Sequence, residues 1–211
     1  MNLCVFQFLK FNLICLLFEA TCLRNQQIKP QEIIEFPCLK IETQNFTVTS
    51  QFHSYVRPLV HPNLSEFCTE LTGILQETVD NQPDLPTVLD NFKTWLQADQ
   101  KEELANFAIV TCGDWDLKTC LPKQCEAYGL EIPFWAKRWI NLKISHQIVH
   151  NGKFPRHLNQ ILTDNGLTFE GRPHSGIDDT KNIARAIQAI ASKGHIFNYT
   201  NQSSVVEAKA S

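Results

Sequence analysis

The chain lacks several features by which a protein class is usually recognised. Its 19 Lys and Arg are outnumbered by 22 Asp and Glu, so the net charge of −3 provides no general basic surface for nucleic acid. None of its eight cysteines forms a CxxC pair, and no Cys/His group has zinc-ligand spacing. Internal repeats and low-complexity segments are also missing. With 211 residues, 43% of them hydrophobic, the chain suits one globular domain, and any nucleic-acid partner would need a local patch or bound metal.

The apolar start of the chain does not have the pattern of a membrane span or of a secretion signal. Lys10 and Asn12 interrupt the apolar run, and no basic segment precedes it. We therefore expect an intracellular protein, cytoplasmic or nuclear, that does not contact membranes and whose cysteines are reduced. A secreted glycoprotein with oxidised cysteines is the alternative. It is suggested by sequons at Asn45, Asn63, Asn198 and Asn201.

Apolar patterns along the chain predict a mixed α/β fold. Short apolar runs predict strands over residues 11–17, 32–41, 48–56 and 107–112. Apolar residues at helical spacing predict helices over 63–71, from Pro86 through Leu96, over 158–162, and from 178 or 179 to 193. Antiparallel strands followed by alternating helices and strands favour a mixed sheet with helices on its faces. We expect the domain to cover 11–197, between an N-terminal segment over 1–10 and a frayed polar tail over 198–211.

Acidic residues stand at the ends of the predicted elements. Glu19 follows the first strand, Asp116 follows the strand that ends at residue 112, and Asp179 lies in the first turn of the last helix. Such positions can converge at one edge of a sheet, where carboxylates could hold Mg²⁺ and His174 could accept a proton. Each residue alone is more simply explained as a helix cap, a turn residue or a solvated loop side chain. The four together indicate a metal-dependent nuclease.

The words around these residues resemble those of a known family, the Eri-type 3′–5′ exoribonucleases. This family is a branch of the DEDDh exonucleases, which have an RNase H-like fold. Within it, the chain resembles most the branch described as a prion-protein interactor. The similar stretches are FEATC at 18–22, EIIEFP at 32–37, FCTELTGI at 67–74, TCGDWDLK at 111–118, WINLK at 139–143 and GRPHSGIDDTKNIA at 171–184.

The resemblance implies a role for each matching residue. Glu19, Asp116 and Asp179 match metal ligands for two Mg²⁺ ions, which Mn²⁺ could replace, and His174 matches the general base. The implied substrate is RNA with a free 3′ end, selected with the help of a possible protein partner. Asp114 and Asp178 match non-catalytic positions. The substrate-contacting positions are matched by Ala20, Thr21, Leu71, Thr72, Gly73 and Ile74. Thr72 and Gly73 could also be only a helix stop.

The chain departs from the family at one position. The family has the motif D-F-E, whereas this chain has Leu17-Phe18-Glu19, and residues 1–18 contain no Asp or Glu. The missing aspartate bridges both metals in the family, so its loss should impair hydrolysis severely. The hypotheses are therefore an impaired exoribonuclease and a catalytically inactive RNA-binding or adaptor protein of the same fold. An alternative or mistaken N-terminal segment joined to a genuine nuclease would also explain Leu17.

Overall fold

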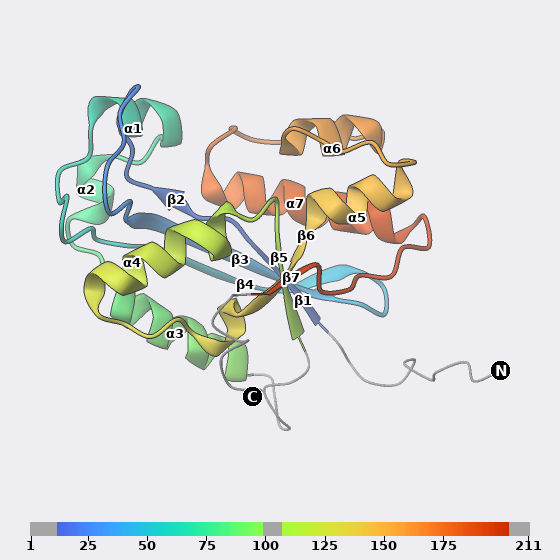
Figure 1. Ribbon diagram of the computed structural model, residues 1–211, viewed down its shortest axis with the longest axis horizontal. Helices are drawn as coiled ribbons and strands as arrows, with labels where there is room; N and C mark the ends of the chain where they lie inside the picture. The colour runs from blue at the N-terminus through green and yellow to red at the C-terminus, as the bar shows by residue number, and fades with distance from the viewer. Residues whose placement is uncertain (1–11, 99–106, 203–211) are drawn as a thin grey trace.

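A twisted sheet with helices on both faces forms the protein, as a computed structural model shows (Figure 1). The structure describes residues 12–98 and 107–202. The predicted N-terminal segment over 1–10 lies outside the described residues, as do positions 203–211 of the predicted tail.

The sheet is mixed, as the sequence predicted. Its strands are β1 (Asn12–Leu16), β2 (Glu19–Ala20), β3 (Ile33–Glu42), β4 (Thr47–Tyr55), β5 (Phe107–Thr111), β6 (Arg138–Asn141) and β7 (Asn201–Gln202). β1 runs parallel to β5, and β5 runs parallel to β6, whereas β3 pairs antiparallel with β1, β2 and β4. The short strands β1 and β2 lie one after the other along the same edge of β3. The chain thus runs along this edge from the sheet centre to Glu19.

Seven α-helices are found in the described part of the chain. They are α1 (Glu66–Thr72), α2 (Gln76–Val79), α3 (Leu85–Gln97), α4 (Leu121–Tyr128), α5 (Leu142–Val149), α6 (Leu158–Asp164) and α7 (Gly176–Ala191). A π-helical turn (Asp116–Cys120) leads into α4. Sequence patterns predicted α1, α3, α6 and α7 but not α2, α4 and α5. The four-residue α2 contains only one apolar residue, Val79, so it shows no helical period.

Two apolar cores lie on opposite faces of the sheet. Successive strand residues point to opposite faces, so Ile14 and Leu16 of β1 pack with α3 and α4, while Leu13 and Cys15 pack with α5, α6 and α7. Strands buried on both faces appear in the sequence as continuous apolar runs, which is why β1 and β5 could be predicted. The second face, with α7, is the one that carries the site.

Buried polar contacts fix the connections around β3 and β5. The fully buried Glu32 carboxylate accepts hydrogen bonds from the backbone N–H groups of Leu59, Val60 and His61, and from the Tyr128 hydroxyl. The segment 59–61 has no regular secondary structure, so this carboxylate supplies acceptors that a helix or sheet would otherwise provide.

Asp114 follows β5, at a position where an aspartate side chain often caps a turn. Its carboxylate instead accepts hydrogen bonds from Trp139 Nε1 at 2.9 Å, from Asn141 Nδ2 at 3.0 Å and from Asn201 Nδ2. Since Asn201 belongs to β7, which pairs with β6, the fold continues beyond residue 197. The expectation of a frayed tail from residue 198 is therefore wrong for residues 201–202.

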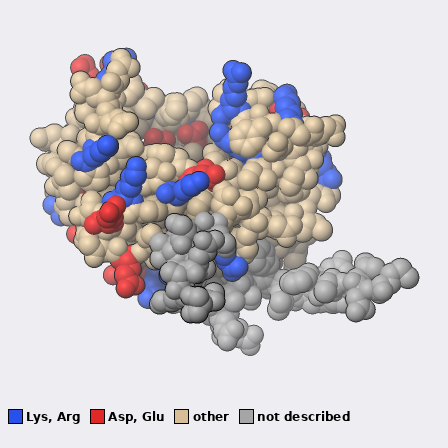
Figure 2. All heavy atoms as spheres, viewed as in Figure 1, with Lys and Arg blue, Asp and Glu red and all other residues tan. Residues whose placement is uncertain are grey.

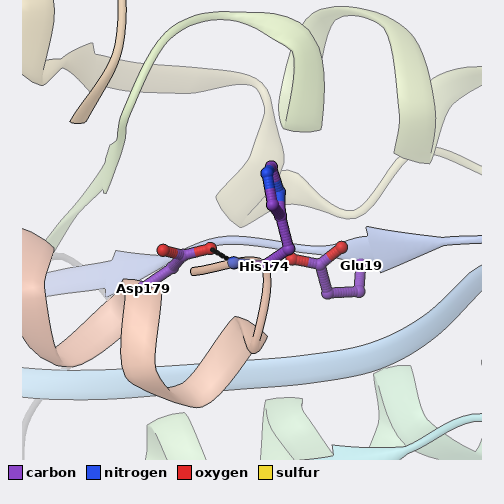
Figure 3. Close-up of side chains that lie close together, drawn as sticks. All are labelled: Glu19, His174 and Asp179. Atoms are coloured by element: carbon purple, nitrogen blue, oxygen red, sulfur yellow. Dashed lines mark hydrogen bonds between the residues drawn. The ribbon is translucent and has the colours of Figure 1, made fainter. Parts of the chain in front are cut away.

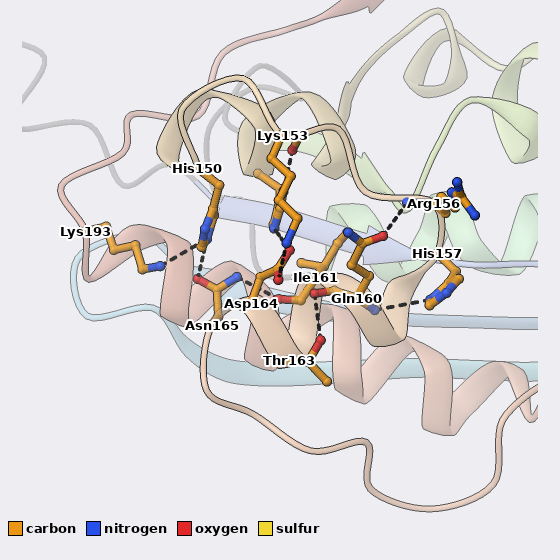
Figure 4. Close-up of polar contacts among 11 residues, drawn as sticks. His150, Lys153, Arg156, His157, Gln160, Ile161, Thr163, Asp164, Asn165 and Lys193 are labelled. Atoms are coloured by element: carbon orange, nitrogen blue, oxygen red, sulfur yellow. Dashed lines mark hydrogen bonds and ion pairs between the residues drawn. The ribbon is translucent and has the colours of Figure 1, made fainter.

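Polar side chains hold α6 against its neighbours (Figure 4). Lys153 forms an ion pair with Asp164 at 2.7 Å, and His157 Nδ1 accepts the backbone N–H of Gln160 at the start of the helix. The seven cysteines of the described residues are free thiols. Among the described residues, no helix combines the length and apolarity needed to cross a lipid bilayer.

Candidate active site

Glu19, His174 and Asp179 come together at one edge of the sheet. One potential ligand atom from each lies within 4.8 Å of the other two. Figure 3 shows that Glu19 comes from β2, Asp179 from the first turn of α7, and His174 from the loop before that helix. Both carboxylates are 8% exposed, whereas His174 is exposed. The sequence prediction that these residues converge is therefore matched by the geometry.

The loop that carries His174 is held by the start of α7. The His174 backbone N–H donates a hydrogen bond to Asp179 Oδ2 at 3.1 Å, and the Asp179 N–H donates to the Ser175 carbonyl at 2.8 Å. His174 has a φ of 63°, a left-handed conformation that is uncommon for a side chain other than glycine. The loop therefore turns sharply at the residue whose imidazole is presented to the site.

Asp116 lies beside this group but not within it. It is 5% exposed, and its Oδ1 accepts the backbone N–H of Phe18 at 2.8 Å. Phe18 stands between Leu17 and Glu19, so this bond ties the π-helical turn after β5 to the segment that joins β1 and β2. Asp116 is thus directed at the first motif while lying outside the 4.8 Å group.

Burial raises the pKa of all three carboxylates. Burial, followed by the charges of Asp179, Glu35 and Asp116, raises the pKa of Glu19 to about 9. Burial raises the pKa of Asp179 to about 7, against the His174 N–H, and the pKa of Asp116 to about 6, against the Phe18 N–H. Crowded, desolvated carboxylates have such shifts, and a bound cation would remove their repulsion. The donor set therefore fits a hard divalent cation.

Leu17 brings no ligand to this site. Its half-buried side chain packs against the apolar core on the α7 face. Two further carboxylates act electrostatically on Asp179, those of Asp178 and Glu35, and both are engaged elsewhere. Asp178 accepts the Arg172 N–H, and Glu35 accepts N–H groups of α7. In the part of the chain that the structure describes, neither is free to replace an aspartate at position 17.

The predicted substrate residues Ala20 and Thr21 lie next to Glu19 but are buried. The Thr21 hydroxyl accepts the Glu32 backbone N–H at 3.0 Å, and the Thr21 N–H donates to the Glu32 carbonyl at 2.8 Å. The Ala20 carbonyl accepts the Cys68 thiol of α1 at 3.8 Å. Both residues therefore have structural roles that the sequence did not reveal.

The other predicted substrate segment, residues 71–74, ends α1. Thr72 is buried and its hydroxyl donates to the Cys68 carbonyl, while Ile74 packs in a small core with Ile34 and Val79. Gly73, with a φ of 76°, is the left-handed C-cap of α1. Leu71 is half-buried and Gly73 is exposed, so these two are the members of the segment most open to a ligand.

Arg172 joins this segment to the His174 loop. Its guanidinium Nη2 donates to the Glu70 carbonyl at 2.7 Å. A Cβ atom on Gly73 would lie only 2.7 Å from Arg172 Nη1, so a larger residue there would displace the guanidinium. Figure 2 shows acidic side chains recessed in a hollow between the α1 side and the α6 side of the molecule. Arg172 was not among the predicted site residues, although it stands in the GRPH word.

Trp115 is a second residue that the sequence analysis missed. Its side chain is 38% exposed, an unusual state for tryptophan, and it directly precedes Asp116. An exposed aromatic side chain next to an acidic residue in the sequence can stack on a base, and its place in the GDWD word could have revealed it.

Comparison with known proteins gives a consistent answer. A model of the Exonuclease family matches residues 15–187. ERI1 exoribonuclease 3 of Homo sapiens is 48% identical over an alignment of 192 residues that covers 88% of this chain and 55% of that protein. The 3′–5′ exonuclease Snipper of Drosophila melanogaster is 35% identical, over 87% of this chain and 70% of its own length.

Solved structures agree with these relatives. The nuclease domain of 3′hExo, a DEDDh family member bound to rAMP, has a TM-score of 0.86 at 33% identity, over 92% of this chain and 98% of that domain. A 3′-exonuclease that recognises the histone mRNA stem-loop has the same TM-score at 32% identity, over 92% of this chain and 87% of that one. The expected RNase H-like fold is confirmed. The chain spans about half the length of the curated relatives it matches first.

Proposed function

The chain belongs to the Exonuclease family, with ERI1 exoribonucleases among its relatives, and from this membership we propose that it trims the 3′ ends of RNA. In this proposal it is a 3′–5′ exoribonuclease whose hydrolysis is impaired by Leu17. One observation carries the proposal: potential ligand atoms of Glu19, His174 and Asp179 lie within 4.8 Å of one another, although the residues are up to 160 positions apart.

Family membership implies a divalent metal, and we propose that the ion is Mg²⁺, with Mn²⁺ able to substitute. Glu19, Asp179 and Asp116 would hold it through carboxylate oxygens, which suit a hard cation. In such sites divalent cations activate water and neutralise charge at the phosphodiester. Leu17 offers no donor to bridge a second ion, so binding of a metal pair should be the weak step.

The chain's own residues supply the remaining chemistry. An imidazole nitrogen of His174 takes a proton from water as the water oxygen attacks the last phosphorus. The bond between that phosphorus and the 3′-oxygen of the penultimate nucleotide breaks, and a nucleoside 5′-monophosphate leaves. The buried setting of Glu19 and Asp179 limits water around the scissile bond, which strengthens every charge interaction there.

Residues at the rim of the site would position the terminal nucleotide. The exposed face of Trp115 provides a surface on which a base can stack. Leu71 and Gly73 would contact the nucleotide from the other side. The buried residues of the predicted substrate set would support the backbone around these contacts, and they are Ala20, Thr21, Thr72 and Ile74. Such stacking tolerates different bases, so we expect little sequence preference from this chain alone.

Selection of a particular RNA would then need a protein partner, and we propose an intracellular setting, cytoplasmic or nuclear, for the encounter. The net charge of −3 supports the need for a partner, because a protein without a general basic surface depends on local contacts to capture RNA.

A second function has one specific observation in its favour. Leu17 packs against the apolar core where the family has a metal-bridging aspartate, so the site could bind RNA without cleaving it. The protein would then be an inactive RNA-binding or adaptor protein with the same fold.

A direct assay distinguishes the two functions. Single-stranded RNA labelled at its 5′ end is incubated with the protein and Mg²⁺, Mn²⁺ or EDTA, and the products are separated on a gel. Shortening from the 3′ end that EDTA abolishes, and that Glu19→Gln lowers by about 10²-fold, supports the enzyme. RNA binding without any shortening, unchanged by Glu19→Gln, supports the adaptor.

A further inference from the structure

A buried glutamate lies directly opposite Glu19. Glu35 of β3 is the register partner of Glu19 of β2, and side chains of such partners stand on the same face of a sheet. The Glu35 side chain is 3% exposed. Two like charges placed opposite one another destabilise a sheet unless one of them is compensated. The groups that compensate the Glu35 charge therefore indicate the role of this residue.

Three donors surround the Glu35 carboxylate. Oε2 accepts the backbone N–H of Gly176 at 2.9 Å, and Oε1 accepts the N–H of Ile177 at 3.1 Å and approaches His53 Nε2 at 2.9 Å. Gly176 and Ile177 are the first two residues of α7, whose N–H groups have no acceptor within the helix. The helix N-terminus also carries partial positive charge, which favours a carboxylate.

The α7 N-terminus is capped by Glu35 of β3, because no side chain of the helix's own N-cap residue does so. Ser175 occupies the N-cap position of α7, but its side chain makes no capping hydrogen bond. Gly176 permits the close approach of β3. A Cβ atom at this position would lie 2.8 Å from Glu35 Oε2 and 3.1 Å from Pro37 Cγ, closer than side chains pack. A larger residue at position 176 would therefore push the Glu35 carboxylate away from the helix N-terminus.

We propose that Glu35 is a positioning residue for the metal site, which seats the N-terminus of α7 so that Asp179 and His174 face Glu19. The two N–H groups that it holds lie between His174 and Asp179 in the chain, and those two residues are joined by their own hydrogen bond. Glu35 thus fixes the α7 side of the site to the strand pair that carries Glu19. This inference rests on the proposed function, because its purpose is the placement of metal ligands.

The test compares Glu35 of β3 with Glu32, the residue directly before that strand. Glu32 is also buried and also accepts backbone N–H groups, but those of Leu59, Val60 and His61, which are not part of the site. Glu35→Gln and Glu32→Gln are prepared in the full chain with wild type. Mn²⁺ binding is measured by calorimetry, and backbone amide exchange is followed by mass spectrometry in EDTA.

Glu35→Gln should weaken Mn²⁺ binding by about 10- to 100-fold and speed exchange at Gly176 and Ile177. Glu32→Gln should speed exchange at 59–61 and change Mn²⁺ affinity by less than about twofold by the same reasoning, because its partners do not carry ligands. Glu35→Asp, which keeps the charge, should recover part of the Mn²⁺ affinity. A folded Glu35→Gln protein with wild-type affinity and wild-type exchange at 176–177 would overturn the proposal.

Two further results keep the outcome decisive. If Glu35→Gln does not fold, Gly176→Ala tests the same contact from the helix, because its Cβ would displace the carboxylate, and it should reproduce the Mn²⁺ loss. Wild-type protein that binds no Mn²⁺ overturns the proposed function itself. In that case the exchange measurement still shows whether Glu35 anchors α7, so the two failures are distinguishable.

Discussion

The backbone N–H of His174 donates a hydrogen bond to the carboxylate of Asp179, at 3.1 Å. The proposed general base, His174, is thus coupled through its backbone to the proposed metal ligand Asp179 in the first turn of α7. The bond also stabilises the charged form of Asp179, opposing the burial that raises its pKa to about 7. Removal of the Asp179 carboxylate should therefore also loosen the loop that carries His174.

Leu17→Asp should raise Mg²⁺-dependent trimming of a single-stranded RNA 3′ end by at least about 10²-fold, because it restores a bridging carboxylate. The gain should be measured with 5′-labelled RNA on a gel. Leu17→Asn, which is polar but carries no charge, is the matched control and should restore much less. Equal rates for wild type and Leu17→Asp would show that position 17 does not limit the enzyme.

His174→Ala should lower the rate of trimming by about 10²–10⁴-fold and leave RNA affinity nearly unchanged, because the imidazole acts on water and not on the RNA chain. Rates come from the gel assay and affinity from fluorescence anisotropy in Ca²⁺. His157→Asn, which replaces an exposed histidine at the start of α6 by another helix-capping residue, is the control. A metal-dependent rate insensitive to His174→Ala would indicate a contaminating nuclease.

The metal-free protein should lose stability as the pH rises. The pKa of Glu19 is raised from 4.5 to about 9 and that of Asp179 from 3.8 to about 7, so the folded state retains protons that the unfolded state releases. This contribution is complete below the unfolded pKa values and is lost as the pH rises through the folded ones. In EDTA, the contribution of Glu19 and Asp179 should thus lower the unfolding temperature as the pH rises from 5 to 8.

Divalent metal should reverse this trend. The ligands must be deprotonated to bind a cation, so Mn²⁺ should raise the unfolding temperature more at pH 8 than at pH 6. Glu19→Gln removes the carboxylate with the largest pKa shift among Glu19, Asp116 and Asp179, and it should reduce both the pH dependence in EDTA and the effect of Mn²⁺. A Mn²⁺ effect that is the same at both pH values would contradict the assignment of these carboxylates as ligands.

Glu32→Ala should destabilise the protein by about 2–4 kcal/mol, because it leaves N–H groups of residues 59–61 and the Tyr128 hydroxyl without their acceptor. Urea unfolding followed by tryptophan fluorescence measures the change. Tyr128→Phe removes one donor and keeps the carboxylate, so it should cost only about 1 kcal/mol. Similar losses for the two variants would mean that the backbone contacts of Glu32 contribute little.

The sequence alone was sufficient for the class of fold and for the site residues that local patterns mark. Buried strands such as β1 and β5 are continuous apolar runs, and α7 has an apolar stripe over several turns, so both could be recognised without neighbours. Glu19 and Asp179 were found because they stand at the ends of these elements. His174 was found through its spacing from Asp179, and Leu17 through the departure from a family word.

Only the tertiary structure decided which of these side chains meet and what holds them. Glu35 appears in the sequence as one more residue of a strand, yet it binds N–H groups that follow it by more than 140 positions. Asp114 seemed a turn residue, but it joins β5 to β6 and β7. Periodicity reports the neighbours of a residue within one element, whereas these contacts cross elements. Their partners are set by the packing of helices on the sheet, which no local pattern contains.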